Sequence, residues 1–461
     1  MHDTSFLDDL SIPDERVTRS DSEKDNHSAD WGTEAREEFE PSEPDAVVYP
    51  VSTKEVSEVV AACHRDGVPV TPYAAGTSLE GNPVPVEGGV SLDLMRMNDV
   101  VEVRPDDLQV VVQPGVLGSA LNAEVEKHGL FLPPLPSSAD ISTIGGMLAN
   151  DAGGMQTVKY GKVGDWVLSL EVVLPDGTVT RLGGPVVKSS SGYSLKDIFV
   201  GSEGTLGVIT EAVMELEGLP EQVRGGRGIF PSLREASEAV SDAVSSGVDV
   251  AKIELVSESA ASMANSYLDS DLPDKPMVFV EFHANHGVDR EVEFCRSIFE
   301  SHGFEEFTVK EEEEMREIWD VRRELGIAIR SHDPELVPVH AGDVTVPIGR
   351  YPDLIRYIDE LAEDTGYPIP CFGHSGDGNV HYIVLVEKGD DDQRRKGNEI
   401  YDRVVEKTLE LDGTVTGEHG VGLGKRKYMK EEHGEALKVM KQIKEAIDPD
   451  GLLNPGKVFP D

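Results

Sequence analysis

The sequence predicts an α+β protein with more than one domain. Short strand-like runs bounded by glycine or proline alternate with segments of helical periodicity along most of the chain. The pattern changes at Gly218-Leu-Pro-Glu221: strands and glycine turns dominate before it, and helices alternate with strands after it. A length of 461 residues allows two or three domains with well-filled cores.

The first half contains a clear helix and a clear hairpin. In Thr53–Asp66, Val56, Val59, Val60 and Cys63 recur at helical spacing and define one apolar face. Asp176-Gly177 is a turn pair between two apolar runs, 168–174 and 178–182, which predicts a hairpin. Further strands are expected at 68–73, 90–94, 100–103, 109–113 and 207–216, and a helix at 120–128 that ends at Gly129.

The second half predicts regularly alternating elements. We expect helices at 232–246, 289–301, 311–329, 351–365 and about 391–411, with strands at 252–256, 277–283 and 344–347. Residues 1 to about 40 are polar and acidic, so we expect a loosely held arm with some helix. The tail at 448–457 is rich in turns but apolar in the middle, and should therefore pack against the fold.

The charge is strongly unbalanced. Lys and Arg total 42 and Asp and Glu total 87, for a formal net charge of −45. Such an excess strains the folded state by self-repulsion, and the screening length falls to about 3 Å at 1 M salt. We therefore predict a halophilic protein of a high-salt cytosol, with an ordinary acidic cytosolic protein as the alternative. Nucleic acid is not an expected partner, because no basic stripe is present.

Cysteine content and hydropathy limit the class further. The three cysteines, Cys63, Cys295 and Cys371, are widely spaced and form no C-x-x-C, which argues against a disulfide framework and a four-cysteine iron–sulfur centre. No apolar run is long enough for a transmembrane helix, and the N-terminus lacks the pattern of a signal peptide. The expected location is the cytoplasm, with no integral membrane segment.

Two histidines enclose a turn in the segment His374-Ser-Gly-Asp-Gly-Asn-Val-His381. A tight turn at Asp377-Gly378 would make them cross-strand neighbours about 5 Å apart on one face, where they can share a metal ion. Downstream, Glu418-His419 offers an oxygen ligand and a further imidazole. The set predicts a site that binds a metal, holds an anionic substrate and removes a proton, although each histidine alone would more simply be a surface or core residue.

Glycine-rich loops follow several of the predicted strands. The first, Ala74–Asn82, combines small residues with the hydroxyls of Thr77 and Ser78, and successive backbone amides in such turns form an anion cradle. Further loops occur at 113–115, 143–146, 150–154 and 201–207, which suggests a long, narrow ligand such as a dinucleotide. No G-x-G-x-x-G motif opens a helix after the first strand, and Gly420–Lys425 lacks the first glycine and the Ser/Thr of a P-loop.

These segments together carry a family resemblance. The order of Pro72-Tyr-Ala-Ala-Gly-Thr-Ser-Leu-Glu-Gly81, then Pro-Pro-Leu-Pro-Ser-Ser, Gly-Ser-Glu-Gly-Thr-Leu-Gly-Val-Ile-Thr and Asn454-Pro-Gly-Lys457 resembles the vanillyl-alcohol-oxidase (PCMH-type) FAD proteins. Within them it is most similar to the branch of D-lactate dehydrogenases, glycolate oxidase flavin subunits and D-2-hydroxyglutarate dehydrogenases. The resemblance implies a two-subdomain FAD-binding domain at 42–219, an α+β cap with the metal site at 220–425, and a C-terminal segment at 426–461 that returns to the FAD domain, after an acidic arm at 1–41.

The resemblance also implies which residues bind FAD. The pyrophosphate would be cradled by Ala75, Gly76, Thr77, Ser78, Leu79 and Gly81, and the flavin would be lined by Pro136, Ser137, Thr143, Gly145, Gly146, Asn150, Gly153 and Gly154. Ile209 would lie on the adenine side and Asn454 near the isoalloxazine. Relatives with covalent flavin often carry a histidine in the first glycine loop, and this loop has none. We therefore expect non-covalent FAD.

The reacting centre follows from the same resemblance. Oxidation of a 2-hydroxy acid needs a cationic anchor for the carboxylate, a base for the hydroxyl proton and an acceptor for the hydride. The family pattern assigns His374, His381 and Glu418 as ligands of a divalent metal (Zn, Mn or Fe), and His419 as the base. It assigns Arg322 as the anchor and flavin N5 as the acceptor. The lysine that 2-hydroxyglutarate enzymes carry before the strand at 343–347 is replaced by His340-Ala-Gly, which favours D-lactate, then glycolate.

Three functions stay open. The first is an FAD- and metal-dependent D-2-hydroxyacid dehydrogenase, with D-2-hydroxyglutarate dehydrogenase as the runner-up activity. The second is a flavin-binding subunit of a multi-subunit glycolate oxidase, and the third is a non-redox enzyme on the same scaffold, such as an ether-lipid synthase. A cytochrome, a quinone or an electron-transfer flavoprotein is the expected electron acceptor, and a second copy of the chain in a homodimer is an expected partner.

Overall fold

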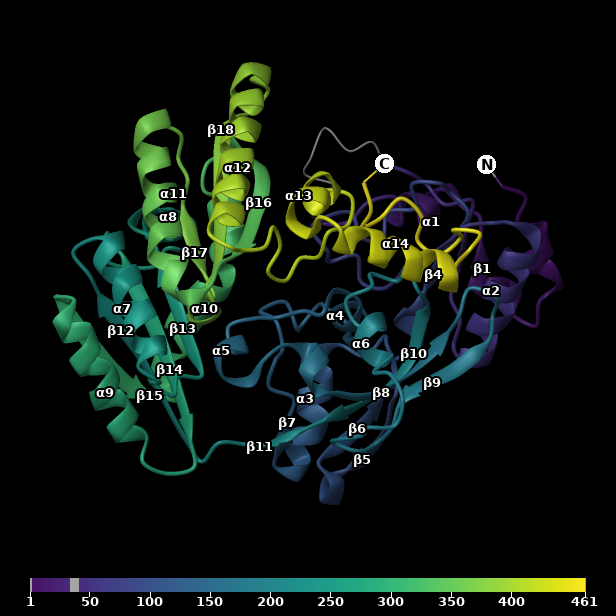
Figure 1. Cartoon of the computed structure of the whole chain (residues 1–461), viewed down its shortest axis with the longest axis horizontal. Coiled ribbons are helices and arrows are strands. Elements are labelled where there is room, and N and C mark those ends of the chain that lie inside the picture. Colours follow the sequence, from purple (N-terminus) through teal and green to yellow (C-terminus); the bar gives the residue numbers. More distant parts are fainter. Residues whose placement is uncertain (1, 34–40, 461) are drawn as a thin grey trace. The chain divides into compact units, whose positions relative to one another are not determined.

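The computed structural model describes residues 2–33 and 41–460, and the chain divides into two compact units (Figure 1). Unit 1 comprises residues 1–152, 162–219 and 418–461, and unit 2 comprises residues 153–161 and 220–417. The change of sequence pattern at Gly218 thus falls beside the boundary at 219/220. The chain returns to unit 1 at Glu418, and residues 153–161 belong to unit 2.

Unit 1 contains two larger sheets. The first has the order β1-β2-β4-β3, in which β2, β4 and β3 are parallel and β1 is an antiparallel edge strand. Its strands are β1 Val17–Thr18, β2 Ala46–Val48, β3 Val70–Tyr73 and β4 Val90–Asp93. The second is antiparallel, in the order β5-β6-β10-β8-β9, with β5 Val100–Arg104, β6 Gln109–Val112, β8 Val167–Val173, β9 Val179–Gly183 and β10 Val208–Glu215. The hairpin predicted at Asp176-Gly177 is confirmed by the pairing of Val173 with Val179.

The helices of unit 1 are short, except for two. Helix α2, Thr53–Asp66, is confirmed at its predicted bounds: the Ser52 side chain accepts a hydrogen bond from the amide of Glu55, and Gly67 ends the helix at φ +65°. The other helices are α1 Asp21–Asn26, α3 Gly118–Val125, α4 Ile144–Asn150, α6 Lys196–Phe199, α13 Met429–His433 and α14 Ala436–Ile447. A small pair of strands, β7 Leu130–Phe131 and β11 Glu217–Gly218, completes the unit.

The described N-terminal residues are folded onto unit 1, whereas we expected a loosely held arm. Strand β1 pairs with β2, and Leu7 and Ile12 are buried in the core against α2. Two apolar side chains at the right positions thus anchor a segment whose overall composition is polar. Residues 34–40, which also belong to the predicted arm, lie outside the described residues.

Unit 2 is built on one antiparallel seven-stranded sheet, in the order β15-β12-β14-β13-β17-β18-β16. Its strands are β12 Gln222–Ile229, β13 Lys252–Val256, β14 Met277–Ala284, β15 Glu306–Glu311, β16 Leu336–Thr345, β17 Cys371–Gly373 and β18 Asn379–Glu387. Its helices are α5 Thr157–Tyr160, α7 Leu233–Ser245, α8 Glu258–Leu268, α9 Val288–Ser301, α10 Glu312–Ser331, α11 Tyr351–Thr365 and α12 Asp391–Glu410. Helices α8 and α10 share a buried apolar cluster with Met277 and Phe279 on one face of the sheet.

Two sequence expectations concern the whole chain. Among residues 2–33 and 41–460, no helix is long and apolar enough to cross a bilayer. All three cysteines are free and buried, which confirms that they form no disulfide framework.

The strand expected at 344–347 is the end of a longer strand, β16, because the preceding residues also pair with β18.

Candidate active site

The two histidines of the predicted metal site lie on either side of the connection between β17 and β18: His374 directly follows β17, and His381 lies near the start of β18. The two strands pair antiparallel, but His381 is opposite Phe372, so the prediction that His374 and His381 are cross-strand partners is wrong. The reason is a longer connection: a 3-10 turn at Ser375–Asp377, closed by Gly378 at φ +81°, replaces the expected two-residue turn. His374 precedes that turn, yet the two ring centroids are 5.1 Å apart at an interplanar angle of 89°.

A buried glutamate on the central strand β13 orients His374. Glu254 is fully buried, and its carboxylate lies 3.0 and 3.2 Å from Nδ1 of His374. An ionised carboxylate can only accept, so Nδ1 carries the proton and Nε2 keeps its lone pair for a ligand. This is the arrangement that fixes the tautomer of a metal-binding histidine.

Arg322 on α10 approaches the same carboxylate from the helix side. Its guanidinium donates to Glu254 and lies over the Phe372 ring at 5.1 Å from the centroid. It is buried, and its Nε makes no hydrogen bond with any described residue. One turn earlier, the buried indole N–H of Trp319 also lacks a partner in the described part of the chain. Unsatisfied buried donors are rare, and two on neighbouring turns favour an anionic ligand at this position.

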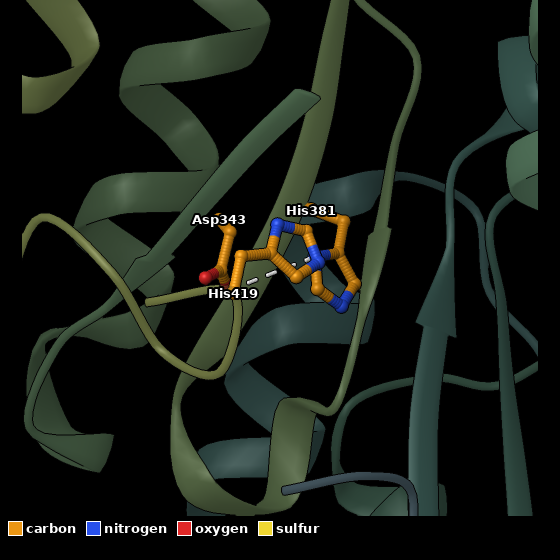
Figure 2. Close-up of side chains that lie close together, drawn as sticks. All are labelled: Asp343, His381 and His419. Carbon is orange, nitrogen blue, oxygen red and sulfur yellow. Dashed lines mark ion pairs between the residues drawn. The ribbon is translucent and has the colours of Figure 1, made fainter. Parts of the chain in front are cut away.

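A second buried carboxylate, Asp343 on β16, lies beside His381. The two residues are register partners, and Asp343 Oδ1 is 3.8 Å from Nδ1 of His381 (Figure 2). Asp343 also accepts hydrogen bonds from Nδ2 of Asn379 at 2.8 Å, from Oγ1 of Thr416 at 2.9 Å and from the backbone amide of Gly417 at 2.9 Å. Asn379 therefore supports the site through Asp343.

The end of unit 2 leads directly to Glu418 and His419. The amide of Gly417, the last residue of unit 2, donates a hydrogen bond to Asp343 on β16. Since β16 pairs with β18 at His381, the chain leaves unit 2 beside this part of the sheet. Glu418 is the next residue, and consecutive Cα atoms are only about 3.8 Å apart. The carbonyl oxygen of His419, whose side chain Figure 2 also labels, accepts a hydrogen bond at 3.1 Å from Nδ2 of Asn150 in unit 1.

The first glycine loop has the form of an anion cradle. It follows β3, and Gly76 adopts φ +65°, which favours glycine. The backbone amides of Ala75, Gly76, Thr77 and Ser78 make no hydrogen bond with described residues, as expected for groups that bind a phosphate. The Ser78 hydroxyl and the Gly81 amide are already engaged, since both donate to Asp30.

The remaining predicted FAD residues lie in several places. Thr143 caps α4, with its Oγ1 accepting from the Gly146 amide, and a Cβ at Gly145 would lie 2.5 Å from Pro114, so the close approach needs glycine. Ile209 is buried in β10. Pro136, Ser137 and Asn150 belong to unit 1, whereas Gly153 and Gly154 open the segment that belongs to unit 2.

Asn454 belongs to a buried polar network in unit 1. Its side-chain amide donates to the carbonyl oxygens of Asn82 at 2.9 Å and Glu203 at 2.7 Å, and so links two glycine loops to the C-terminal segment. Glu203 accepts from the amides of Val421 and Gly422, just beyond His419. Burial raises the pKa of the Glu203 carboxyl.

Lys457 completes this network. Its amine donates to the carbonyl oxygen of Val84 at 2.5 Å and lies 3.3 Å from Oδ1 of Asn454. Burial lowers the pKa of Lys457 to about 7, although the nearby Glu203 acts in the opposite direction. The amine is therefore poised between its two charge states near neutral pH.

Sequence reasoning missed Glu254, Asp343, Asp30 and Glu203. Glu254 had a visible signal, because it stands between Ile253 and Leu255 in the centre of an apolar strand, where a charged residue needs a buried partner. Asp343 lies in a strand with the same kind of signal. Asp30 had no such signal, since it stands in a polar, acidic segment.

Comparisons with known proteins agree with this architecture. Residues 44–183 match the model of the FAD binding domain, and residues 219–458 match the model of FAD linked oxidases, C-terminal domain. A probable mitochondrial D-lactate dehydrogenase of Danio rerio is 37% identical over 422 residues, covering 90% of this chain and 84% of the relative. The glycolate oxidase subunit GlcD of Bacillus subtilis (strain 168) is 35% identical over 423 residues, covering 91% and 89%.

Solved structures share the fold at lower sequence identity. An alkyldihydroxyacetonephosphate synthase superposes with a TM-score of 0.76 at 23% identity, over 98% of this chain and 83% of that one. A p-cresol methylhydroxylase does so with a TM-score of 0.76 at 15% identity, over 98% and 95%. At these identities the likeness concerns the fold alone.

Proposed function

The chain belongs to the FAD-linked oxidase family, and from this premise we propose that it is an FAD-dependent dehydrogenase of a small D-2-hydroxy acid. D-lactate is the favoured substrate and glycolate the next, in keeping with the names of relatives at 35–37% identity. The observation that carries the proposal is the position of Glu254. Its carboxylate bonds to Arg322, a buried arginine whose Nε has no partner among described residues. The same carboxylate bonds to His374, whose ring lies close to that of His381.

Two groups would complete the site. FAD, when bound, supplies the hydride acceptor, and a divalent metal ion supplies a Lewis acid that lowers the pKa of the substrate hydroxyl. The donor set suits Zn²⁺, Mn²⁺ or Fe²⁺: His374 and His381 offer ring nitrogens within 4.8 Å of each other, and Glu418 offers a carboxylate. Non-covalent attachment of FAD is supported by the lack of histidine in the first glycine loop.

Each remaining role falls to a side chain of this chain. Arg322 binds the substrate carboxylate through its free Nε edge and is held in place by Glu254. His419 takes the hydroxyl proton at a ring nitrogen, as a neutral imidazole can near physiological pH. Glu254 and Asp343 keep His374 and His381 oriented, so that neither ring has to reorganise when substrate binds.

The direct test is anaerobic reduction of the bound flavin. We expect D-lactate to bleach the flavin rapidly, glycolate more slowly and L-lactate not at all, because the carboxylate anchor and the base fix one face of the α-carbon. Bleaching by D-2-hydroxyglutarate alone would move the assignment to the runner-up substrate. No bleaching by any 2-hydroxy acid would contradict the proposal and favour a partner subunit or a non-redox enzyme.

Three further properties belong to the same proposal. A cytochrome, a quinone or an electron-transfer flavoprotein would reoxidise the flavin, and relatives in Arabidopsis thaliana and Saccharomyces cerevisiae carry the name D-lactate dehydrogenase [cytochrome]. A high-salt cytoplasm is supported by the net charge of −45, although those relatives are mitochondrial. A homodimer remains part of the proposal.

A further inference from the structure

A segment of the N-terminal region lies along the first glycine loop. We name residues 26–33 the N-terminal strap. The amide of Trp31 donates to the carbonyl oxygen of Gly76 at 3.1 Å, and the amide of Gly32 donates to that of Ser78 at 3.2 Å. Two carbonyl oxygens of the loop expected to bind pyrophosphate are therefore held by the strap.

These two bonds fix the direction of the next two amides. In a trans peptide the C=O and the following N–H point in opposite directions. When the carbonyl oxygens of Gly76 and Ser78 face the strap, the amides of Thr77 and Leu79 face away from it. The strap thus leaves the Thr77 amide, which makes no hydrogen bond with a described residue, directed away from it and available to an anion.

Asp30 secures the same loop through its side chain. It is 2% exposed, and its Oδ2 accepts hydrogen bonds from the Ser78 hydroxyl at 2.7 Å and from the Gly81 amide at 2.8 Å. Its Oδ1 accepts from the amide of Thr33 at 2.8 Å and from the Thr33 hydroxyl at 2.9 Å. The carboxylate thereby connects the middle of the loop, at Ser78, and its end, at Gly81, to the strap.

The strap is itself well anchored. Nε2 of His27 lies 3.1 Å from Oδ2 of Asp93 at the end of β4, and the Tyr73 hydroxyl donates to the carbonyl oxygen of Asn26 at 3.2 Å. At Gly32, a Cβ would lie 2.0 Å from the carbonyl oxygen of Leu79, so the close approach of strap and loop requires glycine.

We propose that the N-terminal strap is part of the FAD site and that Asp30 is a positioning residue for the pyrophosphate-binding loop. Asp30 does not touch the cofactor; it holds Ser78 and Gly81 so that the loop amides are already oriented when FAD arrives. The opposing possibility is that the carboxylate occupies the phosphate position and is displaced by FAD. The two possibilities predict opposite effects of the Asp30 carboxylate on FAD affinity, because a competing carboxylate would weaken FAD binding, whereas a positioning one strengthens it.

The test measures FAD affinity of the apoprotein, by quenching of flavin fluorescence, for the full chain and for Asp30→Asn. Asparagine keeps one acceptor oxygen and turns an NH₂ group toward two donors, so about half of the four bonds are lost. We expect FAD to bind about tenfold more weakly, the usual size for a hydrogen bond to a charged group. Asp25→Asn, an exposed aspartate at the end of α1, is the matched control and should leave the affinity unchanged. Equal or tighter binding by Asp30→Asn would overturn the proposal.

A double-mutant cycle with Ser78→Ala separates positioning from direct contact. If the Ser78 hydroxyl serves Asp30, the losses of FAD affinity in Asp30→Asn and Ser78→Ala should be strongly non-additive in the double variant. Additive losses would mean that Ser78 acts on FAD independently, which would contradict the proposal. Should the Asp30→Asn apoprotein fail to fold, Ser78→Ala alone decides, since it removes one strap bond and no backbone donor: unchanged affinity would refute the role.

Discussion

The carboxylate of Glu254 lies 3.0 Å from Nδ1 of His374, with both side chains buried. The same carboxylate bonds to Arg322, so one residue of β13 orients both a proposed metal ligand and the proposed substrate anchor. It is therefore the part of unit 2 on which the proposed chemistry most depends.

Replacing Glu254 by Gln should weaken metal binding about 10- to 100-fold, the usual effect of losing the partner of a ligating histidine. Metal content after dialysis against a graded series of chelator concentrations measures this. Glu258→Gln, on the exposed first turn of α8, serves as the control and should bind metal normally. Unchanged metal retention by Glu254→Gln would show that Glu254 does not support a metal ligand.

Replacing Arg322 by Lys should raise KM for D-lactate about tenfold or more while changing kcat less, because an ammonium cannot reproduce a guanidinium's planar set of donors. Steady-state kinetics with a dye acceptor separate the two parameters. Arg323→Lys is the control, since Arg323 is exposed and pairs only with Asp320 among described residues. A KM that stays constant in Arg322→Lys would remove Arg322 from the anchor role.

Replacing His419 by Ala should leave FAD bound and slow flavin reduction by D-lactate about 100-fold or more, the usual size of a general-base contribution. Stopped-flow absorbance under anaerobic conditions measures the rate. His433→Ala, in α13 and in the same 418–461 part of unit 1, is the matched control. If His419→Ala reduces its flavin at the normal rate, the base lies elsewhere.

The buried amine of Lys457 predicts a pH-dependent stability. Its folded pKa is about 7, whereas an unfolded lysine titrates near 10.4. Between these values the unfolded chain binds a proton that the folded chain does not, so stability rises with pH across this window. The Tm of the wild type relative to Lys457→Met should thus increase from about pH 7 to about pH 10. Lys438→Met, at an exposed position of α14, is the control and should show no such trend. A Tm difference between the wild type and Lys457→Met that stays constant with pH would mean that the amine stays charged beside Glu203.

The net charge predicts a strong response to salt. Raising KCl toward about 1 M should increase Tm and activity, because screening reduces repulsion among the excess carboxylates. The control is an equal osmolality of sucrose, which stabilises without screening charge. Maximum stability in salt-free buffer would contradict the halophilic assignment.

Periodicity and turn chemistry predicted much of the fold. Helix α2 and the hairpin of β8 and β9 needed only local information: an apolar face, a capping serine and an Asp-Gly turn. Strand β12 was missed because Gly225, Gly226 and Gly228 remove the alternating pattern. A Cβ at Gly225 would lie 2.5 Å from Met315 and one at Gly228 would lie 3.0 Å from Phe299, so close packing favours glycine at both positions. The buried fold of the N-terminal segment was missed because its few apolar residues are informative only once α2 is present.

The histidines of the candidate site could be located in the sequence, but their geometry and their buried carboxylate partners could not. The sequence indicated both histidines, but not the 3-10 turn that prevents them from pairing as cross-strand partners. Glu254 is 120 positions from His374, so only tertiary pairing of β13 with β17 brings them together. Long-range contacts of this kind leave only the weak local signal of one charge in an apolar strand.

The measurement that tests the central claim most directly is the rate of flavin reduction by D-lactate in enzyme stripped of metal and then titrated with Mn²⁺ or Zn²⁺. The wild type should lose the rate on chelation and regain it on addition of the ion, while FAD stays bound throughout. His381→Gln should stay slow at the same ion concentration, because one imidazole ligand is missing. Full activity in the metal-free wild type, or normal restoration in His381→Gln, would contradict the account.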